Sequence, residues 1–183
     1  MLFGVIFDNI TLFLAPHLLG SNVYLLLNKF RFATHALLLP LLIPFGLSVL
    51  HQSGSTIAAN KLLVGALSLI TIGALYFGIH HEIVHLTLGE KSAYGYTRLA
   101  AVGDTLPPIG TIVANLILMV MGIALWKRAG WKWMFLGALF IFALNAATGA
   151  KEYGVLVGNF AEVVFIFSLL LTERWVSSTF KTS

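Results

Sequence analysis

An all-α transmembrane helix bundle is the fold class that this sequence predicts, and three observations predict it. Hydrophobic residues make up 58% of the 183 residues. Charged residues make up only 10%, whereas soluble domains carry about 25%, so too few polar side chains remain to cover a surface that faces water. The third observation is that the apolar residues form segments of the length that crosses a bilayer.

Six apolar segments reach or approach the roughly 20 residues that a helix needs to cross a hydrocarbon core of about 30 Å. We expect them at 2–19, 32–50, 60–86, 109–126, 133–149 and 155–172. Residues 20–31 are expected at the membrane interface, and 87–107 as the longest polar connection. Because Asp8, Asn9 and Pro16 interrupt the first segment, five spans remain if it is re-entrant. With either number of spans, residues 1–183 form a single transmembrane domain.

Prolines, charges and tryptophans mark the ends of these segments. The second contains Pro40 and Pro44, which kink a helix and are tolerated where neighbours satisfy the freed carbonyls. The fourth follows Pro107-Pro108 and ends in a basic hairpin at 127–132, and the sixth ends at Glu173-Arg174-Trp175. Tryptophans at such ends are typical of a membrane–water interface.

Charge predicts the location and limits the partners. The hairpin at 127–132 carries three basic residues and no acidic one, so the positive-inside rule places both termini of a six-span protein in the cytoplasm of a bacterial inner membrane or a similar one. The basic residues are otherwise scattered, which argues against nucleic acid as a partner. Membrane lipid, further copies of the chain or a larger membrane complex are the partners that we expect. A chain without cysteine has no disulfide, iron–sulfur or thiolate zinc site.

Histidines gather at one membrane face in the six-span topology. Only His51 falls at the opposite face. The other five are His17, His35, His80, His81 and His85. This face is therefore a candidate functional face, although histidine is also amphipathic and at home at an interface.

The string His81-Glu82-Ile83-Val84-His85 fits the pattern H-E-x-x-H. On an α-helix, His81 and His85 would share a face and bind one zinc ion, with Glu82 as general base on a metal-bound water. The third ligand would be Asp104, or else His80, His17 or His35. The five residues resemble the zinc-metalloprotease motif, whose nearest polytopic counterpart is the intramembrane site-2 proteases. The later aspartate–glycine motif of those proteases is missing, because Thr105 follows Asp104.

Two acidic residues lie inside predicted spans, Asp8 in the first and Glu162 in the sixth. A charge at the bilayer centre costs about 2.5–3.5 kcal/mol on insertion scales and usually faces the bundle interior. Both fall near the midplane, so we expect them to meet, either in a catalytic or proton-relay site or in a structural polar clamp. Gly154, Gly158 and Glu162 share one helix face, and the glycine pair predicts close approach of another helix. Asn159 adjoins Glu162 as a candidate substrate-binding residue.

Arg31 and His35 lie one turn apart at the start of the second span. They could bind a lipid phosphate, pair with an acid such as Glu152, or lie at the interface with Arg31 extending to the headgroups. His35 could also hold a haem together with His80 or His81.

Three stretches of the chain resemble a group of small uncharacterised multi-pass bacterial membrane proteins. They are Phe7-Asp8-Asn9, the run from Arg31-Phe32 through His35-Ala36-Leu37 to Pro40-Leu41-Leu42-Ile43, and Gly158-Asn159 with Glu162. The resemblance implies a fold and a membrane location but no reaction. It includes Asp8, Arg31, His35 and Glu162 and leaves out the H-E-x-x-H string.

The sequence thus predicts a membrane-embedded enzyme that acts on a lipid or isoprenoid-like substrate by acid–base or metal-assisted chemistry. Asp8, His35, Glu162 and Glu82 are the catalytic candidates, and Arg31 and Asn159 the substrate-binding ones. His81, His85 and Asp104 are the candidate zinc ligands. The alternatives are a small carrier or an assembly partner, and a haem or quinone protein. A polar cavity that joins the buried acids favours an enzyme or carrier, whereas buried acids without a cavity favour a structural partner.

Overall fold

The computed structural model describes residues 2–93, 95–103, 107–149, 151 and 153–180. Helices dominate it, which confirms the all-α class, and one two-stranded sheet accompanies them. The elements are α1 (Leu2–Phe13), α2 (Ala15–Leu18), α3 (Asn22–Leu38), α4 (Leu42–Gln52), α5 (Thr56–Ala59), α6 (Lys61–Gly78), η1 (Ile79–Val84), β1 (Leu88–Ala93), β2 (Tyr96–Ala101), α7 (Ile109–Ala129), α8 (Trp133–Thr148) and α9 (Gly154–Phe180).

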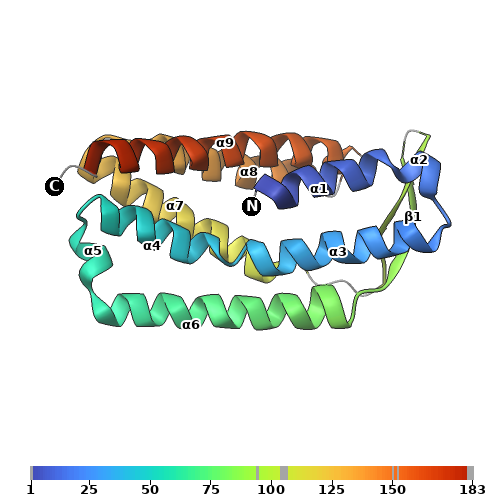
Figure 1. Ribbon diagram of the computed structural model, residues 1–183, viewed down its shortest axis with the longest axis horizontal. Coiled ribbons are helices and arrows are strands. Elements are labelled where there is room, and N and C mark those ends of the chain that lie inside the picture. The colour runs from blue at the N-terminus through green and yellow to red at the C-terminus, as the bar shows by residue number, and fades with distance from the viewer. Residues whose placement is uncertain (1, 94, 104–106, 150, 152, 181–183) are drawn as a thin grey trace.

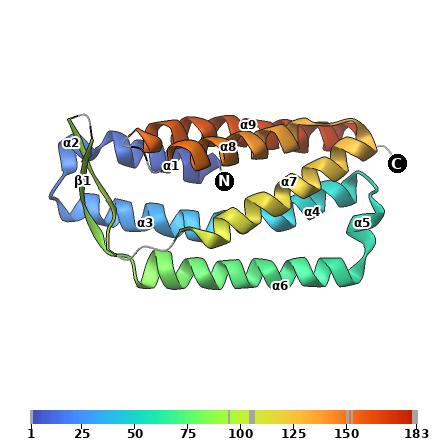
Figure 2. The same cartoon turned by 180° about the vertical axis from the view of Figure 1, so that it is seen from behind.

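The helices form an elongated bundle (Figures 1 and 2). α8 and α9 pack along each other, and α1 lies beside the N-terminal half of α9. α3 and α4 follow one another in a second row, α6 forms the outer row, and α7 runs obliquely between the rows (Figure 2). The β1–β2 hairpin and α2 lie at one end of the bundle, which we call the hairpin end, and α5 lies at the other end.

Four helical stretches in the described part of the chain are long and apolar enough to cross a membrane. They are Asn22–Gln52, Lys61–Val84, Ile109–Ala129 and Gly154–Phe180. α8 and α1 are apolar but shorter. The 12 residues of α1 span about 18 Å at 1.5 Å per residue, less than the hydrocarbon thickness of about 30 Å. α1 therefore lines only the hairpin half of the bundle (Figure 1).

The second predicted span starts earlier than expected. Ser21 caps α3 by accepting a hydrogen bond from the Tyr24 amide, so the helix begins at Asn22. Residues 22–31, expected at the interface, are thus part of a stretch that continues through α4 to Gln52. Pro40 lacks an amide hydrogen and separates α3 from α4, which produces the expected break.

The predicted polar connection also differs from expectation. Part of it folds into an antiparallel hairpin in which Leu88 pairs with Ala101 and Ala93 with Tyr96. Gly95 lies in the turn with φ +75°, a backbone conformation that residues with a Cβ rarely adopt. The hairpin contacts α2 and covers this end of the bundle.

The apolar core lies toward the end of the bundle away from the hairpin. It consists mainly of buried side chains from α4, α7, α8 and α9, among them Leu42, Ile43, Leu118, Leu125, Met134 and Phe165. Within it, Gly137 of α8 faces Ser168 of α9, and a Cβ at Gly137 would lie 1.9 Å from the Ser168 Oγ and 2.5 Å from its Cβ. Close contact between α8 and α9 therefore depends on glycine at this position.

We expect Gly137→Ala to lower the melting temperature of the purified protein in detergent, because overpacking a filled core costs about 1–3 kcal/mol. Gly73→Ala is the matched control, since a Cβ at Gly73 meets nothing within 4 Å, and alanine favours a helix by about 1 kcal/mol over glycine. Equal melting temperatures for the two variants would contradict this packing.

Candidate functional site

Four ionisable side chains from three helices meet inside the hairpin half of the bundle. α1 supplies Asp8, α3 supplies Arg31 and His35, and α9 supplies Glu162. Residues four apart on a helix lie on the same face, so Arg31 and His35 both point toward α1. Asp8 is 1% exposed. The two acids that the sequence placed inside spans are therefore neighbours.

Asp8 is the centre of the cluster. Its Oδ1 accepts a hydrogen bond from the Arg31 Nε and lies 3.4 Å from the His35 Nε2. Arg31 also donates from Nη1 to the Asn28 side-chain oxygen at 3.4 Å, and Asn28 donates to the Tyr24 carbonyl at 2.9 Å. The charge-assisted bond from Arg31 and the contact with His35 both fall on one Asp8 oxygen, which favours one rotamer for each of the three side chains.

Glu162 completes the cluster without such a bond. One ligand atom from each of Asp8, His35 and Glu162 lies within 4.8 Å of the others. The Glu162 Oε2 is buried and has no hydrogen-bond partner among the described residues. A buried, unpartnered carboxyl oxygen is costly, and a functional role is one explanation for its presence.

A cavity of about 240 Å³ joins these side chains. Its wall includes Asp8, Arg31, His35 and Glu162. Glu82 of η1 lines it from the histidine-rich end, and Thr111 and Asn145 add polar atoms. A polar cavity that joins the two buried acids favours an enzyme or a carrier over a structural partner.

Charge balance inside the cluster follows from its composition. The ion pair of Asp8 with Arg31 is neutral, and an uncompensated charge among apolar helices would cost several kcal/mol. One proton shared between His35 and Glu162 keeps the whole cluster neutral, whether it lies on the imidazole or on the carboxyl. The arrangement can therefore move a proton between two buried groups without creating net charge.

The same three ligating residues could hold a metal ion, but Arg31 competes with it. Ligand atoms of a tetrahedral zinc with bonds near 2.1 Å lie about 3.4 Å apart, which is the distance between the His35 Nε2 and the Asp8 Oδ1, and all three ligand atoms lie within 4.8 Å of one another. The Arg31 guanidinium already contacts the Asp8 oxygen that would bind the ion. Two cations on one carboxylate oxygen repel each other, so acid–base chemistry fits this site better than metal binding.

The H-E-x-x-H string does not form the face expected of an α-helix. Residues Ile79–Val84 form a π-helical turn, in which His85 donates its amide to the His80 carbonyl. The ring of His85 consequently lies 4.4 Å from that of His80. His81, Glu82 and His85 line an adjoining hollow near Pro107, and Glu82 lines the cavity as well. Among the described residues, the group of three suited to a metal is the Asp8 cluster instead, and Asp104 lies outside the described residues.

Other candidate residues lie as follows. His35 is 13 residues beyond the start of α3, about 20 Å along the helix, and not at the interface, because α3 begins at Asn22. Arg31 pairs with Asp8, and Glu152 lies outside the described residues. Asn159 donates to the Asn9 side-chain oxygen at 3.2 Å and so bridges α9 to α1. His35 is the one histidine among the described residues that line the cavity, which leaves a bis-histidine haem without its second ligand.

Asn145 is a site residue that the sequence reasoning missed. It lines the cavity, and its side-chain oxygen lies where a Cβ at Gly158 would be 3.2 Å away. The glycine face of α9 thus packs against α8, as its spacing predicts. The available signal was the presence of an amide side chain within the apolar fifth segment.

No protein-family model matches this chain, and no curated protein or solved structure is significantly similar to it. The resemblance to small multi-pass bacterial membrane proteins stays a prediction.

The ion pair at the centre of the site predicts strong energetic coupling between Asp8 and Arg31. We expect Asp8→Asn and Arg31→Met each to destabilise the protein by about 3–5 kcal/mol, because each leaves a buried charge unpaired. The double variant should cost much less than the sum of the two. Unfolding measured in detergent micelles checks this cycle, and additive effects would show that the two side chains do not interact.

Proposed function

We propose that this protein is a membrane-embedded enzyme that acts on a lipid or isoprenoid-like substrate by acid–base chemistry in the Asp8–His35–Glu162 cavity. The observation that carries the proposal is the cavity itself. It brings together, inside an apolar bundle, a histidine–aspartate pair and a carboxyl oxygen that has no hydrogen-bond partner among the described residues. Buried polar groups that face an empty space are the usual mark of a site.

The geometry supports distinct roles for the three residues. Asp8 holds one imidazole nitrogen of His35, as the aspartate of a catalytic triad orients its histidine. His35 then acts as general base, and Glu162 as the acid that returns a proton to the substrate. Arg31 keeps Asp8 ionised and positioned. Glu82 lies at the histidine-rich end of the cavity. Its carboxylate passes protons between the cavity and water.

An apolar slot next to the cavity supports a lipid-like substrate. His35, Glu162, Thr111 and Asn145 line both spaces. The slot continues between α1, α3 and α9, where Val5, Leu38 and Ile166 form its wall. The slot measures about 70 Å³, so it takes only a short apolar group, and a functional group attached to it would lie at the polar residues.

The opposite half of the bundle is closed, because the apolar core of α4, α7, α8 and α9 fills it beyond the cavity. An enzyme site that opens to one side needs no change in this core, whereas a carrier would have to repack it to open the other side. A quinone or another small isoprenoid remains compatible as a substrate.

The basic turn at 127–132 supports an orientation in a bacterial inner membrane or a similar one. That turn lies at the end of the bundle away from the hairpin (Figure 1), and the positive-inside rule assigns this end to the cytoplasm. The C-terminal end of α9 lies there too. The hairpin end and its histidines then face the non-cytoplasmic side.

Mass spectrometry of total lipid extracts tests the proposed activity. We expect cells that produce the wild-type protein to convert a lipid or isoprenoid species that accumulates in cells producing Glu162→Gln or His35→Gln. The conversion rate should fall about 100-fold or more, the contribution of a general acid or base.

Glu173→Gln is the matched control, because it removes an exposed carboxyl from the far end of α9 and should leave conversion unchanged. Size-exclusion chromatography establishes that each variant is folded. Identical lipid profiles for the wild type and folded Glu162→Gln would contradict the proposal.

A further inference from the structure

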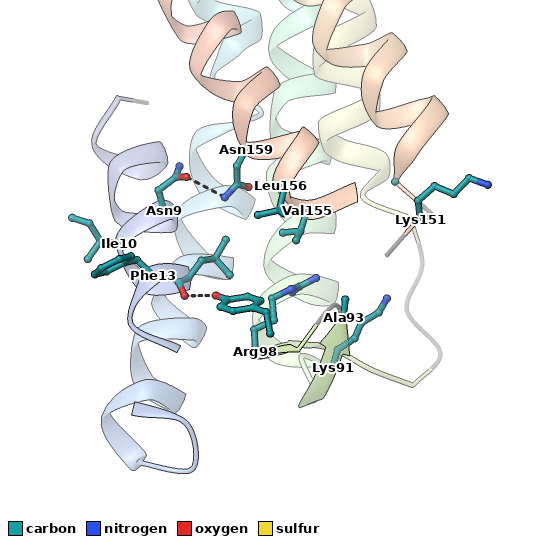
Figure 3. Close-up of a pocket in the computed structure, with 13 residues that line it drawn as sticks. Asn9, Ile10, Phe13, Lys91, Ala93, Arg98, Lys151, Val155, Leu156 and Asn159 are labelled. Carbon is teal, nitrogen blue, oxygen red and sulfur yellow. Dashed lines mark hydrogen bonds between the residues drawn. The ribbon is translucent and has the colours of Figure 1, made fainter. Parts of the chain in front are cut away.

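A second and larger space lies at the hairpin end, between α1, the N-terminus of α9 and the β1–β2 hairpin (Figure 3). It measures about 680 Å³, and we call it the interfacial groove. Ile10 and Phe13 of α1 and Val155 and Leu156 of α9 form its apolar side. Phe13 and Leu156 are strongly exposed, so the groove opens toward the surface that faces lipid.

The hairpin supplies the polar side of the groove, and this side is positively charged. Arg98 and Lys91 extend from the hairpin toward α9, and Lys151 lies at the far rim with its amino group directed outward (Figure 3). Each described lining residue is either uncharged or basic. Glu90 flanks Lys91, but alternate residues of a strand point to opposite faces, so its carboxylate points away from the groove.

The two hairpin cations form an unfavourable pair on their own. Lys91 and Arg98 are directly opposed in the antiparallel register, and like charges at opposed positions destabilise a hairpin. The described residues offer Arg98 only the Leu99 carbonyl, at 3.4 Å. Arg98 is half-buried, and this burial lowers the pKa of its guanidinium. An anion between the two side chains would convert this repulsion into attraction.

The groove is also held in shape. Tyr96 donates its hydroxyl hydrogen to the Leu12 carbonyl and ties the hairpin to α1. Burial raises the pKa of Tyr96, so the hydroxyl keeps that proton. The hydrogen bond between Asn159 and Asn9 ties α9 to α1 at the inner end of the groove and is drawn as a dashed line in Figure 3. The positive end of the α9 dipole adds to the field of the cations.

We propose that the interfacial groove binds a phosphate-bearing lipid, with the phosphate between Arg98 and Lys91 and the apolar chains along α1 and α9. The basic side of the groove matches the phosphate of such a lipid, and the apolar side matches its chains. The binding claim stands on the groove alone, whereas naming this lipid as the substrate class rests on the proposed function.

The groove and the catalytic cavity adjoin each other along the chain. Asn9 follows Asp8 directly, and Asn159 precedes Glu162 by three residues, about 4.5 Å along α9. The groove and the cavity share no lining residue among those described. A lipid chain in the groove would therefore reach the cavity only if the hydrogen bond between Asn9 and Asn159 opened.

Native mass spectrometry of the full-length protein in a neutral detergent tests the binding. We expect dioleoyl phosphatidic acid to bind, and dioleoyl phosphatidylcholine and inorganic phosphate to bind at least tenfold more weakly. The double variant Lys91→Gln/Arg98→Gln should weaken phosphatidic acid binding about 25-fold, at about fivefold for each cation near an anionic lipid. The exchange Lys91→Arg/Arg98→Lys should retain it.

Lys127→Gln/Lys132→Gln is the matched control, since it removes the same charge at the other end of the bundle and should leave binding unchanged. An equal loss in this control, or equal binding of phosphatidylcholine or of inorganic phosphate, would overturn the assignment. Glu162→Gln should bind phosphatidic acid like the wild type. Binding with no lipid conversion would refute the proposed function and leave the groove assignment intact. Conversion with no binding would refute the groove assignment and leave the proposed function intact.

Discussion

A charged side chain inside a membrane must find its compensation within the protein, and the ion pair of Asp8 with Arg31 meets that constraint here. The guanidinium and the carboxylate come from different helices, so the pair also holds α1 against α3. His35 shares the same carboxylate oxygen, and Glu162 adds a carboxyl oxygen that has no hydrogen-bond partner among the described residues. Because the ion pair is neutral, the remaining two groups can exchange a proton without a buried net charge.

The fold divides the bundle into two halves that serve different needs. Toward the basic turn, α4, α7, α8 and α9 share a dry core and supply stability. Toward the hairpin, the shorter α1 takes the place next to α9, and both the cavity and the interfacial groove lie along it. The break at Pro40 falls between the two halves, so α3 belongs to the polar half and α4 to the apolar half. The proposed lipid substrate would meet the polar groups from the side, without crossing the core.

Mid-span charge was the most reliable guide to the site, because the cost of an acid among apolar residues does not depend on the fold. That argument found Asp8 and Glu162, and helical spacing added Arg31 and His35. Spacing failed at His81 and His85, since a π-helical turn changes which residues align and leaves no mark in the sequence. The hairpin was missed because β1 and β2 are short and mostly lack β-branched residues. Lys29 and Arg31 suggested an interface, but both lie within α3, the helix that Ser21 caps at its start.

The central claim is that α1 lies against α9 and so brings Asp8 to Glu162. The wild-type chain has no cysteine, so a cysteine pair can be cross-linked in native membranes without background. We predict that Asn9→Cys/Asn159→Cys is joined efficiently by a short bifunctional maleimide, because the two side chains are hydrogen-bonded in the structure. Leu69→Cys/Asn159→Cys should not be joined, since Leu69 is exposed on α6 in the outer row. Equal cross-linking of the two pairs, or none of the first, would contradict the account.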